Sequence, residues 1–294
     1  MTDPTPPLRY PPRDLGDAWV VAPSGERYWG RFGAAGLLAV DDRRGVLLQH
    51  RASWSHHGDT WGVPGGALHQ HEPAVQAALR EASEEAGVPI DAVRPWLTDV
   101  ADREVWSYTT VVAQVVTPFG ATISDPESLD LAWVPVDEVT RLPLHPGFAA
   151  SWGRLRGLLA VRPVIVVDAA NVVGSVPDGW WRDRPGAASR LLTRLATLAT
   201  RGVPAGALEL PGHTWFTDWA VVLEGQARAA ADVPGLQVVR ADAGGDDRIV
   251  HEAQLLRAGG RPVTAVTSDR GLTERLERLG ATVRPAGWLL DQFS

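Results

Sequence analysis

Three glutamates stand close together in the segment GALHQHEPAVQAALREASEEAGV, residues 66–88. They are Glu81, Glu84 and Glu85, and residues three and four apart are neighbours on the surface of a helix. Like charges at that spacing destabilise an isolated helix slightly. A divalent cation reverses this repulsion, because hard cations such as Mg²⁺ prefer carboxylate oxygens and keep waters for a phosphate substrate. A solvated acidic face is the commoner reading of a lone pair of glutamates, but the residues that surround these three favour a metal site.

The helix that must hold these carboxylates is marked at both ends. Pro73 suits the first helical position and Gly87 suits the residue just past the end, which predicts one helix of about 14 residues. The glycine-rich corner WGVPGG, residues 61–66, precedes it, and a backbone without side chains there can approach a ligand closely. The apolar face of the predicted helix consists of Val75, Ala78, Leu79, Ala82 and Ala86.

The spacing of this segment resembles the Nudix box at every fixed position: Gly66, Glu72, Arg80-Glu81, apolar Ala82, Glu84-Glu85, Gly87 and apolar Val88. The resemblance to Nudix hydrolases extends over roughly residues 30–160. It implies an α/β/α sandwich with a mixed sheet, and Mg²⁺- or Mn²⁺-dependent hydrolysis of a nucleoside diphosphate linked to another group. By the same resemblance Glu81, Glu84 and Glu85 are metal ligands, Gly66 offers a carbonyl oxygen, and Arg80 with Glu72 orients the helix and loop.

The general base for this chemistry is not fixed by the box. Box carboxylates can serve, and Glu127 and Asp130, just before the apolar run LAWVPV, are outside candidates, although loop solubility explains those two equally well. His56 and His57 in WSHHGDTW are candidates to meet phosphate or metal, yet loop histidines are more often bystanders. Trp54 and Trp61 are candidates to stack on a base, but tryptophans beside a sheet more commonly pack against it.

Around the box, apolar runs punctuated by turn residues predict strands at 33–40 and 46–51, joined in hairpin style across Asp41–Gly45. Further strands are expected around 108–116 and 131–134, and a helix over 148–159. Residues 18–160 are thus predicted to form the Nudix domain. Before them, the prolines of the first residues predict a flexible arm over 1–17.

The pattern changes at residues 162–163, where VIVVDAAN begins a continuous apolar run typical of a strand buried on both faces. Strand and helix patterns then alternate to the end, which predicts a second α/β domain over 161–294, with a mainly parallel sheet flanked by helices. Expected strands lie at 219–225, 236–241, 262–269 and 281–285. Expected helices lie at 185–200, after Gly245, and at 271–279.

Acidic and amide side chains recur where these strands end, and ligands gather at the carboxyl ends of strands in such sheets. They are Asp168, Asn171, Glu224, Asp246, Asp247 and Asp269. A helix cap explains any single one, but several at one edge repel unless a cation lies between them. The arrangement VVDAAN, VVLEG, GGDDRIV and TSDRGL resembles PIN-like nuclease domains of the NYN type, with a Rossmann-like α/β/α fold. That resemblance implies a metal-dependent ribonuclease with Asp168, Asp246 or Asp247, and Asp269 as metal carboxylates, assisted by Asn171 and Glu224.

Single-stranded RNA is the partner that such a domain would take. Trp180 and Trp181 offer stacking surfaces, and phosphate contacts are offered by Arg182, Arg184, Arg190 and Arg194. Packing of the tryptophans and solvation of the arginines are the plain alternatives. Residues 1–160 carry 20 acidic residues against 13 arginines, and residues 161–294 carry 15 of each, so neither half is a basic body that binds nucleic acid tightly without specificity.

Composition excludes several kinds of site and several cellular locations. The 294 residues contain no cysteine, which excludes disulfides, thiolate metal sites and a cysteine nucleophile. No stretch approaches the apolar length of a membrane span or resembles a signal peptide, so a cytoplasmic location without membrane contact is expected. A homodimer is left open by the sequence.

Three functions remain. The first is a Nudix hydrolase acting on a nucleotide substrate such as a nucleoside triphosphate, an ADP-ribose-like compound or a capped nucleotide, with a second domain that acts on RNA or nucleotides. The second is an RNA-processing enzyme dominated by the PIN-like domain. The third is a non-catalytic nucleotide sensor, which the intact set of box carboxylates disfavours, because binding alone needs no water activation.

Overall fold

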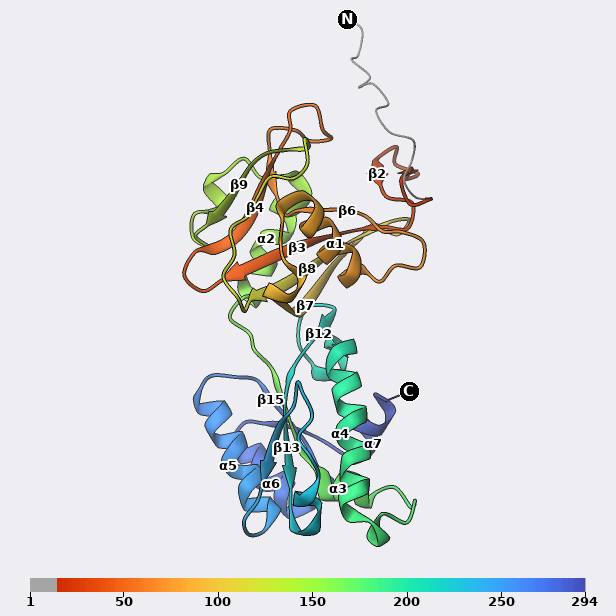
Figure 1. Ribbon diagram of the computed structural model, residues 1–294, viewed down its shortest axis with the longest axis vertical. Coiled ribbons are helices and arrows are strands. Elements are labelled where there is room, and N and C mark those ends of the chain that lie inside the picture. Colours follow the sequence, from red (N-terminus) through yellow and green to blue (C-terminus); the bar gives the residue numbers. More distant parts are fainter. Residues whose placement is uncertain (1–14, 294) are drawn as a thin grey trace, which may run out of the picture. The chain divides into compact units, whose positions relative to one another are not determined.

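The structure is a computed structural model that describes residues 15–293, and it divides into two compact units, Met1–Leu159 and Ala160–Ser294 (Figure 1). The prolines on which the predicted arm depends lie outside the described residues. Among the described residues, no helix is both long and apolar enough to cross a membrane.

A mixed sheet forms the centre of the first unit. Its main strands lie in the order β7-β8-β3-β4-β5, with β6 paired to β3 and β9 paired to β4. The β3–β8 pairing is parallel, whereas β3–β4, β7–β8, β4–β5, β3–β6 and β4–β9 are antiparallel. A separate hairpin of β1 and β2 precedes it. The strands are β1 (Trp19–Val21), β2 (Arg27–Trp29), β3 (Ala34–Asp41), β4 (Gly45–Arg51), β5 (Trp61–Gly62), β6 (Gly65–Ala67), β7 (Val93–Asp102), β8 (Ser107–Val115) and β9 (Ser128–Val134).

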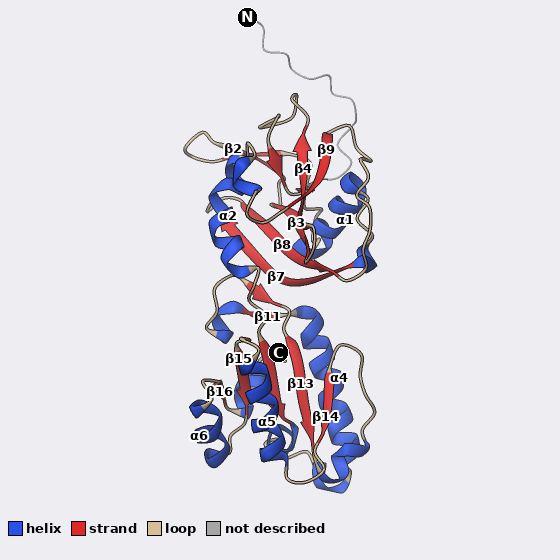
Figure 2. Cartoon of the chain, turned by 90° about the vertical axis from the view of Figure 1, so that its left-hand side faces the viewer, coloured by secondary structure: helices blue, strands red, loops and turns tan. Residues whose placement is uncertain are grey.

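Helices α1 (Ala74–Ala86) and α2 (Pro146–Leu158) lie on opposite sides of this sheet (Figure 2). Short 3-10 turns occur at Ile90–Ala92 and Val139–Arg141. Helix α1 presents the small side chains of Ala78 and Ala82 to Leu37 and Val111 of the sheet, and all four are buried in one core cluster. Because alanines let the helix lie close to the strands, its other side chains reach the loops at the sheet edge. The expected α/β/α layering of this unit is therefore confirmed.

The second unit has a parallel five-stranded sheet in the order β14-β13-β10-β15-β16. Helices α5 and α6 cover one side of it, and α3, α4 and α7 the other (Figures 1 and 2). Its strands are β10 (Val164–Asp168), β13 (Asp218–Leu223), β14 (Gln237–Arg240), β15 (Val263–Val266) and β16 (Thr282–Arg284), with a small antiparallel pair of β11 (Val203–Pro204) and β12 (Thr214–Trp215). Its helices are α3 (Ala169–Gly174), α4 (Arg184–Arg201), α5 (Gly245–Ala258), α6 (Arg270–Arg278) and α7 (Ala286–Asp291), with 3-10 turns at Trp180–Arg182, Ala205–Leu208 and Gly225–Ala229.

Strand β10 is buried over its whole length, as its unbroken apolar run predicts. It is the central strand, flanked by β13 and β15. Since all five strands run in the same direction, their carboxyl ends lie at one edge. This is the edge at which the sequence predicted the acidic side chains to gather.

Candidate active site

The helix of the first unit begins and ends close to the predicted positions. Gly87 ends α1 in the left-handed conformation, with φ 61°, and its N–H bonds back to the helix. Pro73 was expected at the first helical position, but it lies one residue earlier, since its ψ of 139° is extended. The predicted apolar face is confirmed: Ala78, Ala82 and Ala86 are buried in the core, and Val75 and Leu79 pack against it. Ala77 and Glu85 are buried as well.

Arg80 ties the box together. Its Nε and Nη2 each donate to one carboxylate oxygen of Glu72 at 2.9 Å, and Nη2 also reaches the Ala67 carbonyl at 3.1 Å. Its Nη1 donates to Glu81 at 2.7 Å and lies 3.5 Å from Glu84. A planar guanidinium can serve several acceptors at once, which a lysine ammonium cannot do with the same geometry. The helix is thereby fixed to the loop before it.

The glycine corner lies directly against the carboxylates. The Gly65 amide donates to Glu85 Oε2 at 2.9 Å. A Cβ on Gly66 would lie 2.6 Å from the carboxyl carbon of Glu81, so no other residue fits there without displacing that side chain. Glu81 and Glu85 thus lie against the glycine corner, whereas the side chain of Glu84 is 57% exposed.

Burial dominates the electrostatics of this cluster. Burial raises the pKa of Glu85 to about 8, the hydrogen bond from the Gly65 amide opposes this rise, and the nearby charges of Glu81 and Glu127 add to it. Burial also raises the pKa of Glu81, against the lowering effect of Arg80. By contrast, the hydrogen bonds from Arg80 lower the pKa of Glu72. A cation among Glu81 and Glu85 would favour their charged forms, which burial alone disfavours.

Two site residues on β4 were missed by the sequence reasoning. Gln49 is fully buried, and its Nε2 donates to Ser128 Oγ at 2.7 Å and to Glu85 Oε2 at 3.3 Å. Arg51 carries a positive charge that lowers the pKa of both Glu85 and Glu127, and its Nε is buried without a hydrogen-bond partner among the described residues. Side chains two apart share a face of a strand. Polar residues at two such positions of the apolar run VLLQHR were the signal that could have identified them.

The outside candidates for general base are placed differently. Glu127 is electrostatically coupled to Glu85, and partial burial raises its own pKa, with a further contribution from Asp125. Asp130 is exposed and accepts a hydrogen bond from the Leu131 amide. Of the two, Glu127 is therefore the one with an electrostatic link to the box.

The aromatic side chains proposed as candidates near the preceding loop have different surroundings. Trp61 stacks on His50 with ring centroids 4.8 Å apart, which is the packing role that its position beside the sheet favoured. Trp54 is exposed and has no described ring partner. His56 and His57 lie edge to face, with centroids 4.1 Å apart, and His57 also faces His145 at 4.9 Å.

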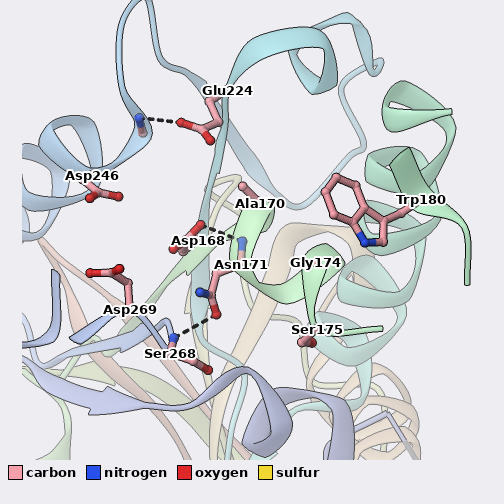
Figure 3. A pocket seen from close by; sticks show the side chains of 11 residues that line it. Asp168, Ala170, Asn171, Gly174, Ser175, Trp180, Glu224, Asp246, Ser268 and Asp269 are labelled. Carbon is pink, nitrogen blue, oxygen red and sulfur yellow. Dashed lines mark hydrogen bonds between the residues drawn. The ribbon is translucent and has the colours of Figure 1, made fainter. Parts of the chain in front are cut away.

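In the second unit the strand-end residues surround a cavity of about 450 Å³ (Figure 3). Its polar lining includes Asp168, Asn171, Glu224, Asp246, Ser268 and Asp269, and Trp180 lines it as well. The Asp246 and Asp269 side chains point toward one another in Figure 3. Burial and then the charge of Asp269 raise the pKa of Asp246. Burial also raises the pKa of Asp168, and Asp246 and Glu224 add to this effect.

Hydrogen bonds account for the orientation of most of these side chains. Asp168 caps α3 by accepting from the Asn171 amide at 3.0 Å and also accepts from Thr267 Oγ1 at 2.9 Å. Asn171 Oδ1 accepts from the Ser268 amide at 2.8 Å, and Glu224 accepts from the Gly245 amide at 2.7 Å. Helix capping, the plain alternative for a single strand-end acid, thus holds for Asp168 and also for Asp269, which caps α6.

Several predicted residues of this unit lie away from the cavity lining. Asp247 is 87% exposed and forms an ion pair with Arg275 at 2.6 Å. Trp181 is exposed and lies edge to face with Trp180. Three of the arginines have local partners: Arg184 lies over the Trp180 ring, Arg190 pairs with Asp178, and Arg194 lies over Phe293. Arg182 belongs to the 3-10 turn that follows Gly179.

A mixed sheet between two helices, with glutamates of one helix held against a glycine corner, defines a Nudix-type α/β domain in the first unit. The family model of the NUDIX domain matches residues 30–153. The chain belongs to the Nudix family and is a hydrolase that acts on phosphorus anhydrides.

Relatives of known name match about half of the chain. A Mycobacterium tuberculosis protein named "Putative 8-oxo-dGTP diphosphatase 3" is 50% identical over 166 residues, which cover 53% of this chain and 76% of the relative. A nucleoside triphosphate pyrophosphatase/Nudix hydrolase fusion protein of Bifidobacterium longum is 37% identical over 49% of this chain and 32% of its own length. The solved structure of the Nudix hydrolase RenU from M. smegmatis is 49% identical, covers 49% of this chain and 96% of that chain, and has a TM-score of 0.45.

Proposed function

We propose that the first unit is a Mg²⁺- or Mn²⁺-dependent pyrophosphohydrolase that cleaves the diphosphate linkage of a nucleoside diphosphate derivative. The observation that carries this proposal is the approach of Glu81 and Glu85 to the Gly65–Gly66 corner, with Arg80 holding Glu72, Glu81 and Glu84. Nudix hydrolases generally use such divalent ions. The names of the relatives support a nucleoside triphosphate, and 8-oxo-dGTP in particular, as the first substrate to test.

The donor set fits a hard cation. Glu81, Glu84 and Glu85 would hold it, together with the Gly66 carbonyl, and carboxylate and carbonyl oxygens are the ligands that Mg²⁺ prefers. The buried carboxyl of Glu85 has one backbone and one side-chain donor, neither of them charged. When bound, the cation would neutralise charge on the diphosphate and lower the pKa of an attacking water.

The remaining roles fall to side chains of this chain. Arg80 is a positioning residue, since it fixes the carboxylates and the Ala67 carbonyl of the corner. Arg51 is proposed to contact a substrate phosphate, because its charge faces the carboxylate cluster while its Nε is buried with no described partner. Glu127 is favoured over Asp130 as the general base, because only its charge is coupled to Glu85.

The test is a turnover screen with Mg²⁺ across nucleoside triphosphates, 8-oxo-dGTP, ADP-ribose, dinucleoside polyphosphates and capped RNA. Release of a nucleoside monophosphate is expected, and Glu84→Gln and Glu85→Gln should each lower kcat roughly 100-fold or more, because a ligand matters at least as much as the groups that orient it. Glu138→Gln is the matched control, since Glu138 is exposed and pairs only with Arg141. Full activity in both box variants would refute the assignment.

The same assay distinguishes a non-catalytic nucleotide sensor from the proposed hydrolase. That alternative requires tight nucleotide binding, measured by calorimetry, with no turnover of any compound in the screen. Turnover that depends on Glu85 excludes it.

We also propose that the second unit is a metal-dependent ribonuclease of the PIN-like, NYN type, or a nucleotide-binding domain derived from one. The cavity lined by Asp168, Glu224, Asp246 and Asp269 supports this proposal, because these acids share one edge of a parallel sheet, and the charges of their neighbours help to raise the pKa of Asp168 and Asp246. Trp180 on the same cavity is the proposed stacking surface for a base of single-stranded RNA.

This activity can be separated from the first by paired variants. Cleavage of single-stranded RNA should survive Glu85→Gln and be lost in Asp168→Asn and Asp246→Asn. Asp247→Asn is the matched control, because Asp247 lies next to Asp246 but is paired with Arg275 and does not line the cavity. Absence of cleavage with Mg²⁺ or Mn²⁺ would contradict the ribonuclease, and absence of nucleotide binding as well would contradict both forms of the proposal.

A further inference from the structure

Three histidines of the first unit meet outside the carboxylate box. His56 and His57 belong to the loop between β4 and β5, and His145 precedes α2. One ligand atom from each ring lies within 4.8 Å of the others. The box assigns them no role, and their nitrogen donors differ in kind from its carboxylate oxygens.

Backbone hydrogen bonds bring the two segments together. The Trp61 amide donates to the Pro143 carbonyl at 2.8 Å, and the His145 amide donates to the Trp61 carbonyl at 2.8 Å. His145 is thereby held beside the end of the loop that carries His57. The pairing joins residues that are distant in sequence, so the approach of the rings is a property of the fold.

The loop itself is constrained. His57 and Asp59 both have φ of 57°, a conformation that side-chain-bearing residues rarely adopt. Thr60 Oγ1 donates to the His57 carbonyl at 2.5 Å, and the Ser55 amide and hydroxyl both donate to the Ala52 carbonyl. His56 also lies edge to face with Trp19, centroids 5.3 Å apart. The two loop rings are therefore presented by a shaped turn.

We propose that His56, His57 and His145 form a site for one borderline divalent transition-metal ion, of the class of Zn²⁺ and Co²⁺. Imidazole nitrogen suits such ions, whereas Mg²⁺ takes oxygen ligands. Three imidazoles leave a fourth tetrahedral position for water or another ligand. The site is thus distinct in chemistry from the carboxylate box and goes beyond the proposed hydrolysis.

Local charges set the conditions for binding. Burial and the positive charge of Arg51 lower the pKa of His145, and burial, His57, Arg51 and Arg27 lower that of His56, so these two rings favour the neutral form that binds metals. The two arginines also repel a bound cation. Salt screens that repulsion, so the affinity is expected to rise with ionic strength.

One existing bond must be given up. His145 Nδ1 accepts from the Gly147 amide at 3.1 Å, so the neutral ring carries its proton on Nε2. A metal on Nδ1 replaces that bond, and a metal on Nε2 moves the proton to Nδ1, which then no longer accepts. Metal binding should therefore speed hydrogen exchange of the Gly147 amide at the start of α2.

The test is titration of the untagged full chain with Co²⁺ in excess Mg²⁺, followed by visible absorption, with Zn²⁺ as competitor. Saturable binding of one Co²⁺ per chain, displaced by Zn²⁺, is expected, and His57→Ala and His145→Ala should each weaken it about tenfold or more. His251→Ala, an exposed histidine of the second unit, should bind as the wild type does.

Glu85→Gln separates this site from the box: it should keep the Co²⁺ absorption even though it loses hydrolysis. Failure of hydrolysis in the wild type leaves this result readable, because the readout is metal binding. If His57→Ala unfolds, His57→Gln takes its place, with circular dichroism to verify its fold. The proposal is overturned if the wild type binds no Co²⁺ or Zn²⁺ saturably, or if binding depends on Glu85 and not on the three histidines.

Discussion

Arg80 donates two parallel hydrogen bonds to Glu72, from Nε to Oε1 and from Nη2 to Oε2, each 2.9 Å long. The same guanidinium donates to Glu81, so Glu72 in the loop before α1 and Glu81 within α1 share one planar donor group. Geometry of this kind fixes direction as well as distance. Loss of these Arg80 hydrogen bonds should therefore affect the placement of the box carboxylates more than the stability of the fold.

Arg80→Lys tests that view. A lysine keeps the charge but cannot make the paired bonds, so we expect kcat to fall about 10- to 100-fold and the Mg²⁺ concentration needed for half-maximal activity to rise. Steady-state kinetics at varied Mg²⁺ measures both. Arg156→Lys is the control, because Arg156 makes a single exposed contact with Asp137. An Arg80→Lys enzyme with wild-type Mg²⁺ dependence would contradict the positioning role.

Gly66→Ala should disable the site by displacing Glu81. The added Cβ would lie 2.6 Å from the Glu81 carboxyl carbon, a distance that atoms do not tolerate. Activity should fall at saturating substrate while the chain stays folded by circular dichroism. Gly153→Ala makes the opposite control: nothing lies within 4 Å of its added Cβ, and in the interior of α2 the change should stabilise by roughly 0.5–1 kcal/mol. Wild-type turnover by Gly66→Ala would argue against close approach at this corner.

Asp41 should contribute stability that depends on pH. The hydrogen bond from the Arg44 guanidinium, with two backbone amides, holds the pKa of Asp41 below its ordinary value of 3.8. A group with a lowered native pKa stabilises the fold above its unfolded pKa, and that stabilisation is lost as the pH falls through the native pKa. The free energy of unfolding in urea should thus favour wild type over Asp41→Asn at neutral pH, with the difference shrinking below 3.8. A difference that is constant with pH would show that the charge of Asp41 is not involved.

Arg154 should matter for stability because of the carboxylate that it covers. Its Nε and Nη2 bind Asp99, whose side chain is only 6% exposed on β7. Arg154→Met leaves that carboxylate buried without its partner, so we expect the free energy of unfolding to fall by about 1–3 kcal/mol. Arg141→Met, which removes an exposed pair with Glu138, should change it by less than about 0.5 kcal/mol. Equal effects of the two substitutions would contradict the role of burial.

The elements nearest the chemistry were predictable because local signals mark them. Pro73 and Gly87 bracket α1 through backbone preferences that do not depend on the rest of the chain. The unbroken run of β10 likewise indicated a strand covered on both faces, and its neighbours followed from the alternation of strands and helices. Strand β7 and the β1–β2 hairpin were missed. β7 contains Pro95 beside a register shift, and the hairpin strands have three residues each, too few for a periodic pattern.

Side-chain roles were less predictable, because they depend on contacts between distant segments. Helical spacing grouped Glu81, Glu84 and Glu85, but that Glu85 is buried beside the Gly65 amide and Gln49 while Glu84 is exposed depends on how the helix packs. The choice between Asp246 and Asp247 depends on Arg275, which lies 28 residues along the chain from Asp247. Gln49 and Arg51 belong to a strand whose hairpin pairing with residues 33–40 was predicted, but the contacts of Gln49 with Ser128 and Glu85 join segments that no local pattern connects.

Each candidate centre draws its side chains from one unit alone: Glu81 and Glu85 precede residue 160, whereas Asp168, Glu224, Asp246 and Asp269 follow it. A lesion in either centre therefore leaves the residues of the other unaltered. Two alleles inactivated in different halves should complement each other when both are expressed in one cell, whereas two alleles inactivated in the same half should not.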